Sequence, residues 1–207
     1  RSCTLERRLN ARMSQLRIRD PIQYLERLHN DPDECDRLID FISIKVTAFF
    51  RDPIVFELIA QKVIPDILEH NRRAGNSQIR VWSAGVATGE EAYSVAILIY
   101  EATLKARDHW HPHIFGTDMS AEALKTAETG IYNRNSLEHT KLGVIDKYFI
   151  NKGETFEVCP FIREMVRFSQ DDLTSKDRFA PAESVFGTFD LVICRNVLIY
   201  FSPELQN

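Results

Sequence analysis

A glycine-bounded turn between a predicted strand and a predicted helix carries the residues with the clearest chemical use. An apolar run at 79–84 predicts a buried parallel strand, Gly85 and Gly89 enclose the turn, and apolar residues then recur at helical spacing. Unpaired backbone N–H groups gather where such elements meet, so the turn can hold a small ligand. Glu90 and Glu91 begin the helix, and two anions there disfavour a pyrophosphate. We therefore expect a ligand with a cationic centre and hydroxyl groups.

The spacing of the two glycines narrows the class of ligand further. Gly-x-x-x-Gly matches neither the dinucleotide fingerprint Gly-x-Gly-x-x-Gly nor the phosphate loop Gly-x-x-x-x-Gly-Lys. A nicotinamide-dependent oxidoreductase is disfavoured on a second ground. Its acidic residue would stand about 20 positions after the glycines, whereas the next strand-end carboxylate, Asp118, lies much further along the chain.

Three predicted strands position the residues of this site. They cover residues 79–84, 113–118 and 189–194 and alternate with helices, which predicts a parallel α/β sheet with right-handed crossovers. Ligands of such sheets bind beyond the carboxyl ends of the strands. This edge brings together a set of glycine and polar residues: Gly85, Glu91, Asp118, Arg195 and Asn196.

Two further segments belong to the same part of the chain. Residues 45–51 form an apolar and aromatic connector, after which Asp52 is expected to cap a helix that begins at Pro53. β-branched and aromatic residues predict a small antiparallel sheet made of residues 147–151, 154–159 and 165–169. We expect the sequence to be a fragment, because it ends before the further strands that such a fold normally has.

The first 44 residues predict a separate, all-helical module. Three short amphipathic helices follow one another, the second and third beginning at the Asp-Pro pairs 20–21 and 31–32. Arg8 and Arg12 share one face of the first helix. This face is either a solvated basic surface or a docking surface for an acidic partner helix, and the sequence leaves both interpretations open.

Composition bounds the class of protein. The chain has 44% hydrophobic and 27% charged residues, as globular proteins do, and no apolar run approaches the roughly 20 residues of a membrane span. Its net charge of −4 disfavours nucleic acid as a partner. Four scattered cysteines favour free thiols in a reducing cytoplasm over disulfides or a metal site: Cys3, Cys35, Cys159 and Cys194.

Several motifs together resemble one known family. They are Thr-Ala-Phe-Phe-Arg-Asp at 47–52, Thr-Gly-Glu-Glu-Ala-Tyr-Ser at 88–94, Gly-Thr-Asp at 116–118 and Phe-Asp-Leu-Val-Ile-Cys-Arg-Asn-Val-Leu-Ile-Tyr-Phe at 189–201. The chain resembles the chemotaxis-receptor glutamate methyltransferases of the CheR type, which use S-adenosylmethionine. Its opening segment looks most like members that are fused to methylesterase and sensor-kinase segments.

The resemblance implies a fold and a division of the chain. A helical domain at 1–48 would recognise the receptor. A Rossmann-like methyltransferase domain at 49–207, incomplete at its C-terminal end, would include a small antiparallel β-subdomain at about 147–169. The implied partner is a methyl-accepting chemoreceptor or a similar acidic helical protein, with Arg8 and Arg12 as docking residues. Fused or associated methylesterase and sensor-kinase domains would accompany it, in the cytoplasm and without insertion into a membrane.

The resemblance also implies roles for single residues. Asp118 would bind the ribose hydroxyls, and Glu91 would lie near the methionyl end of the cofactor. The remaining cofactor-binding positions would come from the connector, the turn and the later strands: Lys45, Thr47, Arg51, Gly85, Asp172, Leu173, Cys194 and Arg195. No metal is implied.

The implied chemistry needs no general base, because a glutamate side chain with a pKa of about 4.3 is already ionised at neutral pH. Alignment of this carboxylate against the sulfonium would carry the rate. Two cations and a hydroxyl group could hold one carboxylate oxygen while the other attacks, so the catalytic residues would be Arg51, Arg195 and Tyr200.

Two positions depart from the family pattern near the cofactor. Lys45 stands where asparagine is usual, and Asp172 stands where asparagine commonly precedes leucine. A lysine there would place a cation near a ligand that already carries one. A second hypothesis therefore accompanies the enzyme: a catalytically degenerate methyltransferase-like module that binds a partner or regulates a signalling protein.

Overall fold

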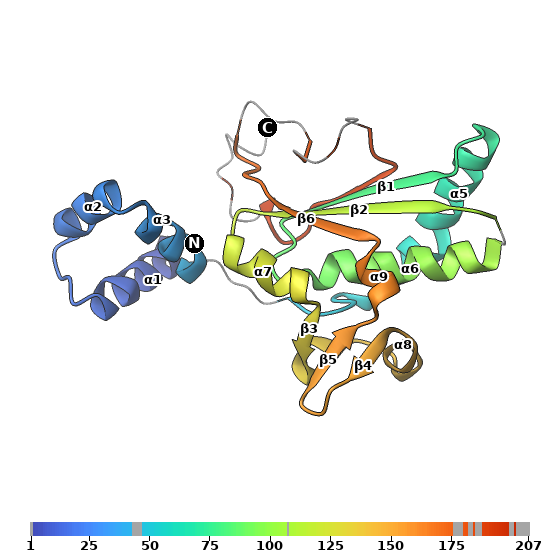
Figure 1. Cartoon of the computed structure of the whole chain (residues 1–207). Helices are drawn as coiled ribbons and strands as arrows, with labels where there is room; N and C mark the ends of the chain where they lie inside the picture. The colour runs from blue at the N-terminus through green and yellow to red at the C-terminus, as the bar shows by residue number, and fades with distance from the viewer. Residues whose placement is uncertain are drawn as a thin grey trace. The chain divides into compact units, whose positions relative to one another are not determined.

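The chain forms two compact units, Arg1–Val46 and Thr47–Asn207 (Figure 1). A computed structural model describes residues 2–42, 47–106, 108–175, 180–181, 184, 188–198 and 201. None of the helices formed by these residues has the length and apolar character that crossing a lipid bilayer requires.

The first unit consists of three helices, α1 (Ser2–Gln15), α2 (Pro21–Asn30) and α3 (Pro32–Ile42). The two predicted proline starts are confirmed. Asp20 caps α2 by accepting a hydrogen bond from the N–H of Ile22 at 2.9 Å. Met13 and Tyr24 supply buried apolar surface, as the amphipathic pattern predicted.

The second unit begins with a helical segment that contains one wide turn. It runs through α4 (Pro53–Leu58), the π-helical turn η1 (Ile59–Val63) and α5 (Ile64–Arg73). Pro65 accounts for the wide turn, because proline lacks an N–H and its ring crowds the carbonyl group one turn back. The cap differs from the prediction: Asp52 stands at the N-cap position, but its side chain makes no capping hydrogen bond.

Four parallel strands form the main sheet in the order β6-β2-β1-β7. They are β1 (Gln78–Ala84), β2 (His111–Asp118), β6 (Val166–Gln170) and β7 (Leu191–Ile193). Helix α6 (Glu90–Ala106) follows β1, helix α7 (Ala121–Thr129) follows β2, and both lie below the sheet in Figure 1. Ser120 caps α7 by accepting a hydrogen bond from the N–H of Ala123. The parallel α/β prediction is thus confirmed.

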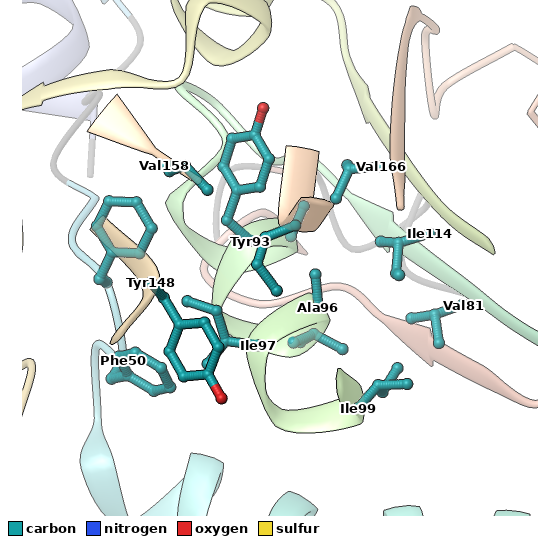
Figure 2. Packing of buried hydrophobic residues seen from close by; sticks show 14 of the residues in the cluster. Phe50, Val81, Tyr93, Ala96, Ile97, Ile99, Ile114, Tyr148, Val158 and Val166 are labelled. Carbon is teal, nitrogen blue, oxygen red and sulfur yellow. The ribbon is translucent and has the colours of Figure 1, made fainter. Parts of the chain in front are cut away.

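The core of the second unit lies between the sheet and α6. Figure 2 shows Val81, Ile114 and Val166, from three neighbouring strands, beside Ala96 and Ile99 of α6. All five side chains are buried. Burying one large aliphatic side chain contributes about 1.5–3 kcal/mol, so this packing holds α6 and the turn before it firmly on the sheet.

A second, antiparallel sheet has the order β3-β5-β4. Its strands are β3 (Ile131–Asn133), β5 (Thr155–Val158) and β4 (Phe149–Asn151), and the short helices η2 (Arg134–Leu137), α8 (Leu142–Tyr148) and α9 (Pro160–Arg163) accompany them.

The membership of this small sheet differs from the prediction. Residues 165–169 were expected in it, but residues 166–169 belong to β6, which pairs in parallel with β2 of the main sheet. The third strand is instead Ile131–Asn133. An alternating pattern predicts a strand without naming its partner, and a three-residue strand is too short for alternation to reveal.

Candidate functional site

The turn after β1 requires both of its glycines. Gly85 has a φ of +76° and Gly89 a φ of +92°, which favour glycine. A Cβ on Gly85 would lie 2.3 Å from Cγ2 of Val197, and a Cβ on Gly89 would lie 2.7 Å from Cβ of Ala127. The first contact brings the segment after β7 against the turn, as the strand-edge rule predicted.

Asp118 ends β2 and joins the turn to the start of α7. Its Oδ2 accepts a hydrogen bond from the N–H of Ala87 at 2.8 Å, and its Oδ1 accepts one from the N–H of Ser120 at 2.9 Å. A carboxylate offers about four acceptor positions in all. The group is therefore fixed in place and retains acceptor capacity for hydroxyl groups of a ligand.

Glu91 lies in the first turn of α6, with 15% of its side chain exposed. Its Oε1 accepts a hydrogen bond from Oγ of Ser83 at 2.8 Å, and its Oε2 accepts one from Nη1 of Arg195 at 3.2 Å. Burial raises the pKa of Glu91; Ser83, Arg195 and the charge of Arg51 oppose the rise. A bound cation would complete the pairing of this carboxylate.

Arg195 links the end of β7 to the connector that precedes α4. Its Nη2 donates to the backbone carbonyl of Arg51 at 3.2 Å and to Oδ2 of Asp52. Its guanidinium also stacks on the ring of Phe56, 5.4 Å from the ring centre. Together with Glu91, these contacts draw three separate segments to one point at the edge of the sheet.

Cys194 stands beside this point. Burial raises the pKa of its thiol, and the negative charge of Glu91 adds to the rise. A thiol with a raised pKa is a poor nucleophile at neutral pH. Cys194 therefore suits the wall of a site better than a covalent step.

Glu90 is a member of the site region that sequence reasoning did not assign. It is 2% exposed and accepts hydrogen bonds from Oγ1 of Thr88 at 2.7 Å and Oγ of Ser136 at 3.4 Å. Burial raises its pKa, and hydrogen bonds including one from Thr47 oppose the rise. Tyr132 of β3 donates to the carbonyl oxygen of Thr88 at 2.7 Å. Glu90 and Tyr132 thus tie the turn to the connector and to the small sheet.

Unusual backbone conformations gather around the same edge. Four non-glycine residues there have positive φ angles: Phe50 (55°), Asp52 (62°), Ala87 (49°) and Asn196 (60°). They belong to the connector, the turn after β1 and the segment after β7. Such conformations cost free energy and cluster at functional sites. This local signal supports the strand-edge assignment independently of the side chains.

The remaining predicted cofactor residues are placed less tightly. The N–H of Asp171 donates to the carbonyl oxygen of Asp118 at 3.1 Å, which brings the segment of Asp172 and Leu173 beside β2. The carboxylate of Asp172 is exposed and accepts from the N–H and the Oγ1 of Thr174, at 2.8 and 2.7 Å. Leu173 is partly buried. Lys45 and Tyr200 lie outside the described residues.

The predicted docking face of α1 needs a correction. Nε and Nη2 of Arg12 donate to the two carboxylate oxygens of Glu34, at 2.9 and 2.8 Å, and the Tyr24 hydroxyl donates to Oε1 of Glu34 at 3.0 Å. Glu34 is fully buried. Arg12 therefore faces into its unit, because a buried carboxylate requires a partner. Arg8 is partly buried on the same helix.

Comparison with protein families agrees with this geometry. The all-α domain of CheR methyltransferases matches residues 2–43, and their SAM-binding domain matches residues 45–207. The chain belongs to the CheR methyltransferase family. S-adenosylmethionine is accordingly the cofactor, and the expected fold, an all-α domain followed by a Rossmann-like SAM-binding domain, is confirmed.

Three similar proteins cover between 88% and 98% of this chain. A chemotaxis protein methyltransferase of Listeria innocua is 36% identical over 88% of this chain and 64% of its own length. Chemotaxis protein methyltransferase 1 of Pseudomonas aeruginosa is 32% identical over 96% of this chain and 71% of its own length. A 104.1 kDa protein of Rhodobacter capsulatus is 36% identical over 98% of this chain, which spans only 20% of that relative. The chain thus spans from a fifth to about seven tenths of the length of these three relatives.

Proposed function

We propose that this chain transfers the methyl group of S-adenosylmethionine to glutamate side chains of a chemoreceptor-like protein, forming glutamyl methyl esters. The observation that carries the proposal is the placement of Arg195. It lies at the edge of the sheet that in our proposal holds the cofactor, beside the partly satisfied carboxylate of Glu91. A cation in that position suits an acceptor that is itself a carboxylate.

The residues of the site suit the chemical groups of the cofactor. In our proposal Asp118 accepts the ribose hydroxyl groups, and Glu91 faces the cationic methionyl end. In this proposal Thr47, Cys194 and the segment of Asp172 and Leu173 line the rest of the site, and Lys45, which is outside the described residues, remains a cofactor-binding residue. Gly85 leaves room at the turn, where any side chain would meet Val197. Turn, strand end and helix start thus match the hydroxyl groups and the cation of the ligand.

The residues of this chain would act by orientation. The cofactor supplies a methyl group on a sulfonium, which a carboxylate oxygen can take up as the carbon–sulfur bond breaks. The acceptor glutamate needs no base, since it is ionised at neutral pH. Arg195, Arg51 and Tyr200 hold one oxygen of that carboxylate, so the other points at the methyl group.

We further propose that the first unit recognises the receptor. The proposal keeps Arg8 as a docking residue and removes Arg12, whose guanidinium is committed to Glu34. The match to a 104.1 kDa relative, of which the chain spans 20%, supports a setting in which this pair of domains stands beside others. In our proposal these others are methylesterase and sensor-kinase segments. The reaction would take place in the cytoplasm, where S-adenosylmethionine is made.

The test combines binding with product chemistry. The chain is titrated calorimetrically with S-adenosylhomocysteine and is then incubated with methyl-labelled S-adenosylmethionine and a receptor signalling domain. Methyl esters release labelled methanol in base, whereas methylated amines do not. Asp118→Asn should abolish binding, and Asp146→Asn, an exposed carboxylate on α8, is the matched control. Binding without labelled methanol would contradict the enzyme and support a binding module.

A further inference from the structure

Asp52 uses its side chain in an unexpected way. Aspartate at a helix start normally accepts a hydrogen bond from the first turn. Here the N–H of Val55 is bonded to the backbone carbonyl of Asp52 at 2.9 Å, and the side chain makes no cap. Its carboxylate instead accepts a hydrogen bond from Nη2 of Arg195, 143 positions along the chain.

The backbone of Asp52 is adapted to this contact. Its φ of 62° and ψ of 71° are left-handed, a conformation that costs free energy in any residue other than glycine. Phe50 precedes it with a φ of 55°. A forfeited cap and two unfavourable conformations persist only where the surrounding structure requires them. The interaction that these features make possible is the hydrogen bond from Arg195 to the carboxylate of Asp52.

Asp52 and Glu91 hold Arg195 from two sides. Nη1 of Arg195 donates a hydrogen bond to Glu91, and Nη2 donates hydrogen bonds to Asp52 and to the carbonyl of Arg51. Phe56 stacks against the group at 5.4 Å. These three hydrogen bonds use three of the five N–H groups of an arginine. The guanidinium is therefore fixed in orientation and retains donors.

Asp52 also balances the charge of the cluster. Arg51 and Arg195 carry two positive charges, and Asp52 and Glu91 carry two negative ones. Without Asp52, Arg195 would have Glu91 as its only carboxylate partner in this cluster. That pairing would neutralise the anion that a cationic cofactor needs.

We propose that Asp52 is a positioning residue of the methyl-acceptor site, which orients Arg195 toward the incoming carboxylate and keeps Glu91 available to the cofactor. Asp52 itself contacts Arg195 and not the reacting atoms. The inference rests on the proposed function and adds a residue to it.

The first test separates orientation from folding. Asp52→Gly removes the carboxylate and relieves the left-handed backbone, so its unfolding temperature should equal or exceed that of the natural chain. Its turnover number should nevertheless fall by about tenfold or more, with an unchanged or lower KM for the receptor domain. Asp52→Asn should likewise lower the turnover number while leaving KM unchanged or lower. Glu57→Gln, which removes an exposed carboxylate from the same helix, should leave all three quantities unchanged.

The second test does not depend on turnover. In the natural chain, nuclear magnetic resonance should resolve separate guanidinium N–H signals for Arg195, because bonds on both nitrogens hinder rotation. In Asp52→Gly and Asp52→Asn these signals should average, and in Glu57→Gln they should remain separate. If the natural chain transfers no methyl groups, the proposed function fails and this measurement alone judges Asp52. Unchanged Arg195 signals, or turnover within twofold of the natural chain, would overturn the inference.

Discussion

Each unit contains a glutamate that is paired with an arginine and is fully buried (Glu34) or largely buried (Glu91), and the two pairs are built differently. In the first unit Arg12 donates two hydrogen bonds to Glu34, at 2.9 and 2.8 Å, and Tyr24 donates a third at 3.0 Å. Led by the bonds from Arg12, these donors hold the pKa of Glu34 below its usual value. In the second unit Arg195 donates one bond to Glu91, at 3.2 Å, and burial keeps the pKa of Glu91 above its usual value.

The difference separates a structural pair from a functional one. A bidentate, fully satisfied pair is costly to break and has nothing left to offer a ligand. Arg195 is divided among Glu91, Asp52 and the carbonyl of Arg51, so Glu91 stays incompletely neutralised. Carboxylates with raised pKa values in such settings are typical of binding sites.

The largest effect on stability is expected from breaking the first pair, Arg12 and Glu34. Arg12→Met leaves the carboxylate of Glu34 buried without its main partner and should lower the unfolding free energy of the first unit by about 3–5 kcal/mol. Native-state hydrogen exchange of the α1 and α3 amides in the whole chain measures this loss. Arg37→Met removes a cation that is 51% exposed and pairs at 3.6–3.8 Å, and should cost less than about 1 kcal/mol. Equal losses in the two variants would contradict the comparison.

Breaking the second pair should affect turnover more than stability. Given the proposed function, Arg195→Met should lower the turnover number by about 100-fold, because the acceptor carboxylate loses its orienting donor. Glu91 can take up a proton when its partner is lost, which limits the cost to folding. Methyl-transfer kinetics and hydrogen exchange of the β1 amides measure the two quantities. A loss of protection in β1 as large as that expected for Arg12→Met in α1 would show that both pairs are structural.

The two glutamates should respond to pH in opposite directions. The pKa of Glu34 is depressed on folding, so its stabilisation is present above the unfolded pKa of about 4.3 and is lost as pH falls through the folded pKa. The pKa of Glu91 is raised, so its contribution is present below about 4.3 and is lost as pH rises through the folded pKa.

Calorimetric unfolding between acid and neutral pH measures this contrast. The stability advantage of the natural chain over Glu34→Gln should shrink on acidification, and its advantage over Glu91→Gln should grow. If the two stability advantages changed with pH in the same direction, this prediction would be refuted.

The smallest effects are expected when the hydroxyl group that donates to each glutamate is removed. Tyr24→Phe removes one bond to Glu34 and should lower the unfolding free energy of the first unit by about 1 kcal/mol. Ser83→Ala removes the 2.8 Å bond to Glu91 and should raise the pKa of that carboxyl further, with a smaller change in stability. Carbon-13 titration of the glutamate side chains detects the second shift. A pKa of Glu91 that stays constant in Ser83→Ala would leave Ser83 without an electrostatic role.

Much of the candidate site was predictable because it follows local rules. Gly85, Asp118 and Arg195 each stand at the end of a buried strand or within two residues of it, and parallel strands bring their carboxyl ends to one edge. Glu90 and Glu91 could not be told apart by the same means. Neighbouring residues on a helix point about 100° apart, and only the packing of α6 decided which carboxylate faced Arg195 and which faced the hydroxyl groups of Thr88 and Ser136.

The sequence by itself determined the local features of this protein: its helix starts, the glycine turn, the buried strands and the edge at which they end. These features depend on residues a few positions apart, whose periodicity and backbone preferences act within one element. Only the tertiary structure decided which distant residues and strands of the chain pair with one another. Residues 166–170 pair with β2, Arg12 turns inward to Glu34, and Asp52 gives up its helix cap for Arg195. Each contact joins distant parts of the chain, and the identity of a distant partner depends on how whole elements pack.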